Sequence, residues 1–292
     1  MSIHDDLGNR MKTFHEEIPK TRLMRRMPVI IRNDGCNFHT LAREFKRPFD
    51  DVLIKTMQET TKYLCENIQG CSLGYTESDK ISLLLIDYQR FKTSAWFDYE
   101  IQKMCSISAS MATIAFNRFF HKNIADMIWN GKYSGSEVRY TNIYNDALKK
   151  GAMFDTRVFN IPKEKVANYF YWRQLDCSKN SIQMVGRANF SHKELQNKSC
   201  NDIQDMLMTQ KGIDWNDFLT YQKHGSCVIK ENYFQSCEDG KFIKLSDGCS
   251  DPYEDKESEN GVWRSRWIID KDIPIFKDEG RQYIEKLVYI GK

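Results

Sequence analysis

A short stretch close to the N-terminus, residues 28–39, constrains the fold of this chain more than any other. An apolar, β-branched run from Pro28 to Ile31 predicts a buried strand, which stops close to Asp34-Gly35, and a helical pattern begins at Asn37 or His39. A carboxylate at a strand end, beside a glycine and a helix N-terminus, suits a divalent cation and a phosphate together. The same Asp-Gly pair is also typical of a plain turn, so these residues alone leave both interpretations open.

A second polar cluster lies in the stretch from Cys71 to Ile86, where two β-prone runs flank a polar tetrapeptide. This pattern predicts a β-hairpin whose tip carries Glu77, Ser78 and Asp79. If the first strand pairs with both hairpin strands, Asp34 and Asp79 face each other. Neighbouring carboxylates repel, and a pair of Mg²⁺ ions bridging a triphosphate would remove that repulsion. Without Asp34, the tip would be interpreted as a solvated turn.

The bulk composition is that of an ordered globular protein. The chain has 292 residues, 41% of them hydrophobic, and a formal charge of +3, so a nucleic-acid surface would have to be a local patch. Nine cysteines without a CxxC pair favour a reducing compartment, although Cys237 and Cys249 could share a zinc ion. No apolar run is long enough to span a membrane and residues 1–27 contain no signal core, so we expect a cytoplasmic protein.

The remaining patterns predict an α+β protein with a ferredoxin-like β-α-β-β-α-β palm. We predict helices over residues 52–64, 96–120, 163–176 and 201–211, strands over 154–159 and 225–231, and a loop-rich excursion over 122–153. Residues 1–27 predict an amphipathic helix that leads into the first strand. A catalytic domain would cover residues 1–235. The tail, residues 236–292, would dock on it through a strand at 262–269 and a helix at 278–288, separated from the catalytic domain by an exposed loop at 251–260.

Several motifs together resemble the tRNA-His guanylyltransferase family, and particularly its bacterial and archaeal tRNA-repairing relatives. The motifs occur in family order and cover roughly residues 22 to 235. They are Arg32-x-Asp34-Gly35-x-Asn37-Phe38-His39, Lys46-Arg47-Pro48-Phe49-Asp50, Tyr75-x-x-Ser78-Asp79, Trp96-Phe97 with Lys103, Phe154-Asp155-x-Arg157-Val158, Tyr171-Trp172-Arg173-Gln174-x-Asp176 and Gly225-Ser226-Cys227-Val228.

The resemblance implies a nucleotidyltransferase that extends the 5′ end of a tRNA in the 3′–5′ direction. It also implies that the ferredoxin-like unit is a polymerase palm, which the family shares with nucleotidyl cyclases. Asp34 and Asp79 would be catalytic and, with the Gly35 carbonyl, would hold two Mg²⁺ ions. Substrates would be GTP, ATP or other nucleoside triphosphates, and family members form homotetramers. The nucleotide and its phosphates would contact Asn37, Phe38, His39, Arg47, Asp50, Ser78 and Lys103. RNA would contact Arg25, Arg26, Lys179, Asn180, His192 and Lys193.

Two departures from the family pattern bear on function. Members specialised for tRNA-His carry His-Ile-Asn-Asn where this chain has Ser178-Lys179-Asn180-Ser181, which favours repair of 5′-truncated tRNA over tRNA-His-specific addition of G. An acidic residue often follows the hairpin aspartate, whereas this chain has Lys80. Lys80 leaves a catalytically weak tRNA-binding relative as one alternative. A cyclase-like enzyme that acts without RNA is another, disfavoured by the Trp-Arg-Gln and Gly-Ser-Cys-Val matches.

Overall fold

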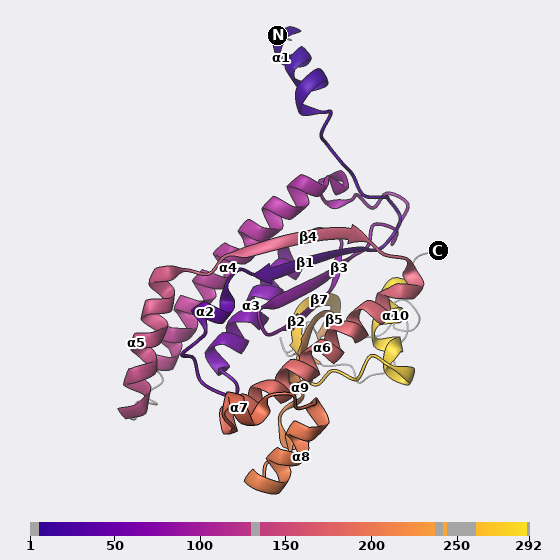
Figure 1. Ribbon diagram of the computed structural model, residues 1–292. Coiled ribbons are helices and arrows are strands. Elements are labelled where there is room, and N and C mark those ends of the chain that lie inside the picture. The colour runs from indigo at the N-terminus through magenta and orange to yellow at the C-terminus, as the bar shows by residue number, and fades with distance from the viewer. Residues whose placement is uncertain (1–5, 130–134, 237–241, 244–260, 291–292) are drawn as a thin grey trace.

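The fold is organised around one antiparallel sheet, seen in a computed structural model that describes residues 6–129, 135–236, 242–243 and 261–290. The strand order is β4-β1-β3-β2-β5-β6, and β7 also pairs with β5 (Figure 1). The strands are β1 Val29–Gly35, β2 Cys71–Glu77, β3 Lys80–Leu85, β4 Phe154–Asn160, β5 Ser226–Ser236, β6 Phe242–Ile243 and β7 Gly261–Asp270.

Helices cover both faces of this sheet. Helices α3 (Asp51–Asn67) and α4 (Ile101–Trp129) pack on one face, where Ile31 joins their core, and α6 (Lys163–Asn189) and α10 (Gln282–Val288) pack on the other face with Ile30. Because side chains alternate along a strand, Ile30 and Ile31 reach opposite cores, and both are fully buried. The order β1-α3-β2-β3-α4-β4 confirms the predicted α+β class and ferredoxin-like unit.

The hairpin forms as predicted, but its pairing with the first strand differs. Strand β1 pairs with β3 and β4 and has no partner in β2, so the prediction that it would pair with both hairpin strands is wrong. The connection through α3 joins the parallel strands β1 and β2 with a gap of one strand between them, and β3 fills that gap. Strand β1 is also longer than predicted and includes Asp34 and Gly35.

Two predicted segments differ from the structure, and the first differs because glycine does not break a helix at the positions where the prediction assumed it would. The predicted excursion over 122–153 is mostly helical, since α4 continues to Trp129 and α5 covers Gly135–Lys150. Gly135 begins α5 and Gly151, in the left-handed region with φ +69°, follows its end, so these glycines flank the helix. The start of α4 is later than predicted because Phe97 and Asp98 adopt left-handed backbone conformations in a short 3₁₀ turn, Trp96–Tyr99.

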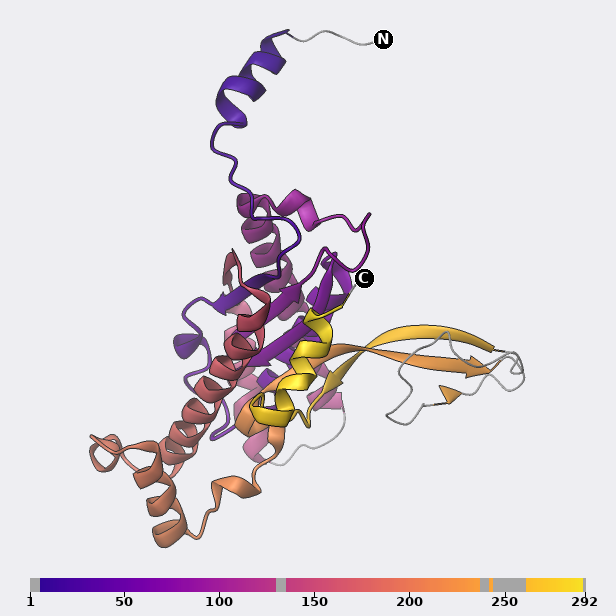
Figure 2. The same cartoon turned by 90° about the vertical axis from the view of Figure 1, so that its right-hand side faces the viewer.

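Shorter elements complete the chain. Helix α1 (Asp6–Met11) and a π-helical turn (Lys12–Glu16) project from the body (Figures 1 and 2). The others are α2 Phe38–Leu41, α7 His192–Leu195, α8 Cys200–Lys211, η3 Trp215–Asp217, α9 Thr220–His224 and η4 Asp278–Arg281. The predicted helix at 201–211 is therefore present as α8. Residues 251–260, Cys237 and Cys249 lie outside the described residues.

The C-terminal part of the chain is continuous with the palm. Strand β7 pairs along β5, and the two form a ribbon that extends from the body (Figure 2). Phe276 and Ile284 pack with Leu73 and Tyr75 of β2 in the core under α6. The predicted boundary between residues 235 and 236 falls inside β5.

Candidate active site

The end of β1 and the tip of the β2–β3 hairpin meet at one edge of the sheet. The Gly35 amide donates to the Asp79 carbonyl oxygen over 3.0 Å, which fixes the strand end against the turn. Ser78 adopts the left-handed region with φ +50°, and this conformation lets a two-residue turn connect β2 to β3. The structure thus brings the backbones of Asp34 and Asp79 together, as the sequence predicts.

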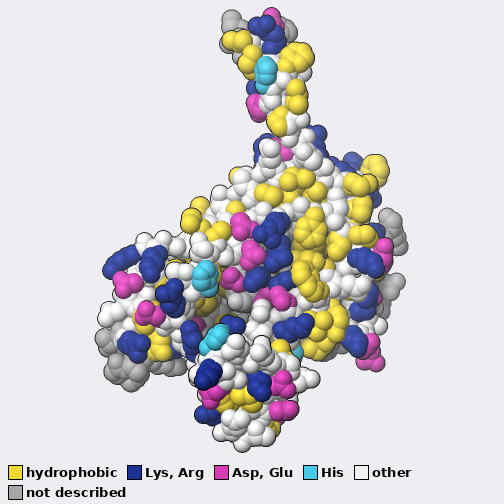
Figure 3. All heavy atoms as spheres, in the orientation of Figure 1, with side chains coloured by type: hydrophobic (Ala, Val, Ile, Leu, Met, Phe, Trp, Pro, Cys, Tyr) yellow, Lys and Arg dark blue, Asp and Glu magenta, His cyan; other side chains and the backbone are white. Residues whose placement is uncertain are grey.

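Charged side chains form a row across four strands at this edge. The register places Asp155, Asp34, Lys80 and Glu77 opposite one another on β4, β1, β3 and β2. Asp34, Glu77 and Lys80 lie an even number of residues from Ile30, Tyr75 and Leu84 in the core under α6, so they share the face of the sheet that α6 covers. Figure 3 shows Lys and Arg side chains intermixed with Asp and Glu side chains in the middle of this face.

Each candidate metal-binding carboxylate has a cation beside it. Arg32 lies 3.1 Å from Asp34, and the Lys80 ammonium lies 2.9 Å from Asp79. Burial opposes the charge on Lys80, but the surrounding carboxylates, led by Asp79, outweigh it and raise the pKa of Lys80. Both aspartates, Asp34 and Asp79, are therefore held next to a positive neighbour.

The donor atoms at this edge suit a Mg²⁺ ion that is also bound by substrate and water. They do not suit a metal ion that is enclosed by protein ligands alone. Within the described residues, no three His, Cys, Asp or Glu side chains lie close enough to hold an ion. Two carboxylates and the Gly35 carbonyl are oxygen donors, and Mg²⁺ is usually held by one or two carboxylates with substrate phosphates and water supplying the rest. These residues can accept Mg²⁺ together with a triphosphate.

Gly35 is required by the close approach of Phe38. A Cβ atom on Gly35 would lie 2.3 Å from the ring of Phe38. That ring is buried and packs 5.2 Å from each of Phe116 and Phe154, centroid to centroid. The Phe38 side chain is therefore part of the core, and only its backbone is available to a nucleotide. Asn37 and His39 on either side are exposed.

Asp50 caps α3, and its carboxylate oxygens are occupied. One oxygen accepts from the Leu53 amide over 2.9 Å, and the other accepts from the Lys46 amide and the Tyr144 hydroxyl over 2.9 and 2.7 Å. This is the N-cap arrangement in which a buried carboxylate satisfies free amides. Asp50 lies near the hairpin tip but acts there as a structural residue.

Lys103 does not join the other predicted phosphate ligands. It lies on the first turn of α4, where its ammonium is 3.6 Å from Glu100, and the neighbouring backbone bonds to residues 21–23 ahead of β1. Seven-residue β1 spans roughly 20 Å, and Asp34 lies close to its other end. Helix α4 also covers the opposite face of the sheet from Asp34. Within one chain, Lys103 is remote from the two aspartates.

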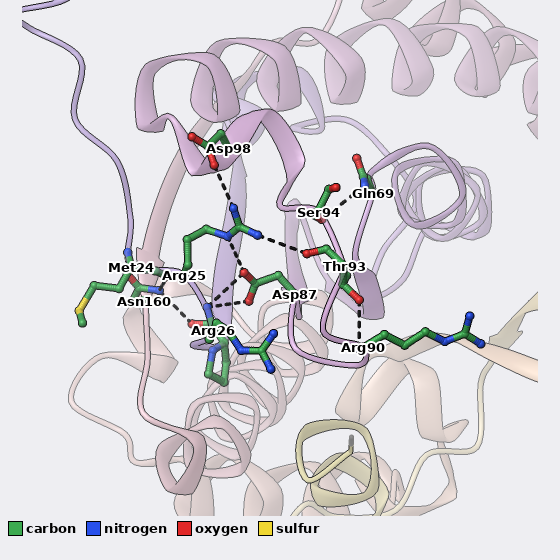
Figure 4. A network of polar contacts seen from close by, with 11 residues as sticks. Met24, Arg25, Arg26, Gln69, Asp87, Arg90, Thr93, Ser94, Asp98 and Asn160 are labelled. Carbon is green, nitrogen blue, oxygen red and sulfur yellow. Dashed lines mark hydrogen bonds and ion pairs between the residues drawn. The ribbon is translucent and has the colours of Figure 1, made fainter. Parts of the chain in front are cut away.

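Arg25 is held in a structural network beside the start of β1 (Figure 4). Its guanidinium donates to buried Asp87 over 2.7 Å, to Asp98 over 3.0 Å and to the Thr93 carbonyl over 3.2 Å. These bonds tie the segment before β1 to the loop after β3. The Arg26 amide also donates to Asp87, whereas the Arg26 side chain is exposed. Arg25 therefore stabilises the fold at the end of β1 opposite to Asp34.

Two cavities flank α6. The remaining residues predicted to bind nucleotide or RNA line one or the other of these cavities or lie near them. One, with about 510 Å³ of empty space partly open to solvent, is lined by Phe49, Asp50, Leu53, Ile54, Glu77, Ser78, Cys177, Asn180, Ser181, Met184 and Gln222. The other, about 890 Å³ and also open, is lined by Arg47, Gln183, Arg187, Phe190, His192, Leu195, Gln196, Lys198 and Ile203. Lys179 and Lys193 are exposed near them.

Sequence reasoning missed a buried ion pair behind the hairpin tip. Arg173 of α6, only 2% exposed, donates over 2.5 Å to Glu77 Oε1 and over 2.8 Å to Asp176. Burial raises the pKa of Glu77 to about 7, against the opposing pull of Arg173 and Lys80. Glu77 Oε2 is buried and has no hydrogen-bond partner among the described residues. The Trp172-Arg173-Gln174 motif carried the only sequence signal for this pair.

Comparison with known proteins agrees with this geometry. The Thg1 family model, described as tRNAHis guanylyltransferase, matches residues 8–162. The tRNA(His) guanylyltransferase of Debaryomyces hansenii is 27% identical over 216 residues, covering 70% of this chain and 73% of that protein. The Saccharomyces cerevisiae enzyme is 23% identical over 217 residues, covering 70% and 82%.

Solved structures extend the likeness to nearly the whole chain. A bacterial tRNA(His) guanylyltransferase (Thg1)-like protein in complex with ATP has a TM-score of 0.74 and 38% identity, covering 98% of this chain and 100% of that one. Its complex with GTP has a TM-score of 0.70 and 36% identity, with the same coverage. The Saccharomyces cerevisiae structure, at 19% identity and a TM-score of 0.58, shares the fold.

The palm and these likenesses define the protein as a nucleotidyltransferase. More specifically, the chain belongs to the tRNA-His guanylyltransferase family. Among the residues that the structure describes, no helix has the length and apolar character needed to cross a bilayer.

Proposed function

We propose that this enzyme repairs tRNA by adding nucleotides to a truncated 5′ end, in the 3′–5′ direction and directed by the opposite strand. The observation that carries the proposal is the junction at which the Gly35–Asp79 hydrogen bond sets Asp34 beside the hairpin tip. The bacterial Thg1-like protein, similar over 98% of this chain, binds ATP in one structure and GTP in another, which supports nucleoside triphosphates as substrates.

The chain's residues would bind, orient and neutralise the reacting groups. Asp34, Asp79 and the Gly35 carbonyl would hold the two Mg²⁺ ions, which supply Lewis-acid activation of the incoming 3′-hydroxyl and charge stabilisation on the triphosphate. The 3′-oxygen would bond to the α-phosphorus at the 5′ end of the RNA and lose its proton, and the P–O bond to the leaving group would break. Pyrophosphate would leave from a 5′-triphosphate end, and AMP would leave from a 5′-monophosphate end activated by ATP. The Asn37–His39 backbone and the Ser78 hydroxyl would bind phosphate oxygens.

Lys80 would take an accessory part in this reaction. Its ammonium is 2.9 Å from Asp79 and its position in β3 is opposite Asp34 in β1. A cation placed there stabilises two adjacent carboxylates before substrate arrives and can screen a phosphate afterwards. Lys80 is therefore compatible with catalysis although relatives often have an acidic residue at this position.

The repair branch is supported by the position of Ser178-Lys179-Asn180-Ser181 inside α6. Ser178 contacts His224 Nδ1 over 2.9 Å and buried Ser181 accepts from the Trp215 indole over 3.0 Å. These two residues are used inside the protein, while Lys179 is exposed. A lysine offers charge to RNA phosphates without reading bases.

The deciding experiment is incubation with a panel of 5′-truncated tRNAs, labelled nucleotides and Mg²⁺, with the products resolved on a gel. We expect each tRNA to be extended by the nucleotide complementary to its template position. Failure to extend any tRNA, with tRNA binding retained, would support the catalytically weak relative. Formation of a cyclic nucleotide without RNA would support the cyclase alternative.

The names of the relatives favour one second candidate, tRNA-His-specific addition of G. The relatives from Debaryomyces hansenii and Saccharomyces cerevisiae are both named tRNA(His) guanylyltransferase. The same panel separates the two functions once tRNA-His without the added G and mismatched nucleotides are included in it. Addition of G to tRNA-His alone, whatever the template base, would replace the repair proposal.

A further inference from the structure

Trp172 of α6 is an exposed aromatic residue that is held in a fixed orientation. It is 50% exposed, although tryptophan is mostly buried in folded proteins. The guanidinium of Arg173 lies 4.6 Å from the centre of the indole ring, and the ring centre of Tyr169 lies 5.8 Å away at an interplanar angle of 63°. Arg173 is itself fixed by its ion pairs with Glu77 and Asp176. Trp172 therefore presents a large, rigid and flat apolar surface to solvent.

The exposed ring lies on the side of α6 that faces β1 and β4. Tyr169, one turn earlier on the same side of the helix, contacts the Ser82 hydroxyl of β3 over 3.0 Å. Its ring also packs 5.9 Å from that of Phe159 on β4, centre to centre. Figure 3 shows hydrophobic side chains directly beside the charged side chains on this face. The helix thus places Trp172 over the same face of the sheet as the charged row.

The surface beside Trp172 has charges that suit an RNA end. The register places Ser82 opposite Arg32, and Asp34 lies two residues further along β1, which is roughly 7 Å. Arg157 of β4, also opposite Arg32, is 63% exposed, and its ion-pair partner on the same strand lies 3.7 Å away. A cation held so loosely can turn toward an RNA phosphate. An aromatic ring and an available cation therefore lie together beside the proposed metal site.

We infer that Trp172 stacks on the base at the 5′ terminus of the RNA and holds that end next to the metal site. The inference rests on the proposed function, in which the incoming triphosphate binds at the hairpin tip and at the Asn37–His39 backbone. The face of β1 and β4 then remains for the other reactant, the RNA end. Stacking uses the flat face that every base has, so Trp172 positions RNA without reading its sequence, and base choice stays with the template strand.

The test is equilibrium binding of a 5′-truncated acceptor-stem RNA hairpin to the full chain, without nucleotide or Mg²⁺. Two versions of the RNA are compared, one with an intact 5′-terminal nucleotide and one in which that nucleotide lacks its base. We expect Trp172→Ala to weaken binding of the intact RNA by about 5- to 100-fold, because stacking of one base on an aromatic ring is lost. Binding of the RNA without the terminal base should change by less than about twofold.

Two further variants and one spectroscopic probe sharpen this comparison. Trp172→Phe should restore most of the difference between the two RNAs, since it keeps an aromatic ring. Leu175→Ala, at an apolar residue that is 41% exposed on the same helix, is the matched control and should bind both RNAs as the wild type does. A 2-aminopurine base at the 5′ terminus should lose more fluorescence on binding to the wild type than on binding to Trp172→Ala, because stacking quenches it.

Several outcomes would overturn the inference. Equal weakening of both RNAs by Trp172→Ala would mean that this residue acts on the RNA backbone or on the fold. If Trp172→Ala does not fold, Trp172→Leu takes its place, and wild-type discrimination between the RNAs in that variant would overturn stacking. Because no nucleotide is present, normal discrimination combined with failure to extend tRNA would count against the proposed function alone. Extension of tRNA by a wild type that does not discriminate between the RNAs would count against Trp172 alone.

Discussion

At the scale of single residues, Asp34 and Asp79 carry the proposed chemistry. We expect Asp34→Ala and Asp79→Ala each to reduce nucleotide addition by at least about 10²-fold, because several kcal/mol of charge stabilisation would be lost. Steady-state addition to a 5′-truncated tRNA measures this, and circular dichroism checks the fold. Asp155→Asn, opposite Asp34 on β4 with a half-exposed side chain, is the matched control and should lose less than about 10-fold. Near-normal turnover of either alanine variant would refute the site.

Gly35 gives a second residue-scale prediction. Gly35→Ala should displace the Phe38 ring, destabilise the protein by about 1–3 kcal/mol and abolish addition, because Phe38 supports the Asn37–His39 backbone. Denaturant unfolding and the addition assay measure the two effects. Gly212→Ala, at a left-handed position with open space around it, should cost about 1–2 kcal/mol and keep activity. Activity in Gly35→Ala equal to that of Gly212→Ala would contradict this role for Gly35.

At the scale of elements, the contact of α9 with α6 depends on an uncharged histidine. His224 contacts Ser178 and packs edge-on against Trp215 at 5.7 Å. Burial, and then Lys223, lowers the pKa of His224 below its usual 6.5. The unfolded chain therefore takes up the proton first as the pH falls. The stabilisation is complete above about pH 6.5 and is lost as the pH falls through the folded pKa.

The lowered pKa of His224 predicts a measurable difference between the wild type and a variant without this histidine. The free energy of unfolding of the wild type should fall between pH 7.5 and pH 5.5, and His224→Gln should show a smaller fall because its amide does not titrate. Urea unfolding at both pH values measures the difference. His121→Gln, on α4, controls for the general effect of removing a histidine. An acid-induced fall that is the same in all three proteins would show that His224 is not responsible.

The elements also explain how the row of charged side chains forms at one edge of the sheet. Strand β3 lies between β1 and β2, so one strand carries Lys80 opposite Asp34 on one side and opposite Glu77 on the other. Helix α6 then supplies Arg173 from above the same face. The charged row is thus a product of register, because a shift of one residue in β3 would turn Lys80 toward α3 and α4.

At the scale of the whole molecule, the cavity lined by Arg47, Arg187, His192 and Lys198 is basic, and we propose that it is a surface for RNA. If Arg187 contacts one phosphate, Arg187→Gln should weaken tRNA binding and reduce the slope of log affinity against log salt by about 0.7–0.9. Nucleotide binding should stay unchanged. Lys165→Gln, exposed at the other end of α6, is the matched control and should leave the slope unaltered. An unaltered slope in Arg187→Gln would remove this cavity from the RNA surface.

The projecting N-terminal arm gives a prediction about assembly. Leu7, Met11 and Phe14 are 59%, 48% and 61% exposed and recur at helical spacing. We expect a homotetramer in solution, and we expect Leu7→Asp with Phe14→Asp to reduce its mass, because large exposed apolar residues on one side of a helix favour contact between copies. Light scattering measures the mass, and Arg10→Asp on the same helix is the control. An unchanged mass in the double variant would show that the arm is not part of the interface.

Much of the architecture could be predicted from local patterns. The β-branched run before Asp34 and the alternation flanking Ser78-Asp79 predict β1 and the hairpin, because apolar periodicity follows directly from burial on one or both faces. The motifs that resemble the family were also sufficient to indicate a palm and its two aspartates. Helix ends were less predictable. Gly135 begins α5 and Gly151 follows its end, so these glycines mark the limits of a helix and do not indicate a loop between them.

The sequence by itself therefore determined the strand–helix order of the palm, the two candidate aspartates and the family. Only the tertiary structure decided which distant residues meet. It separated Lys103 from Asp34, used Arg25 and Asp50 for structural contacts, and placed Arg173 against Glu77. The physical reason is that pairing across strands and packing between helices depend on contacts between residues far apart in the chain, and local periodicity carries no information about those contacts.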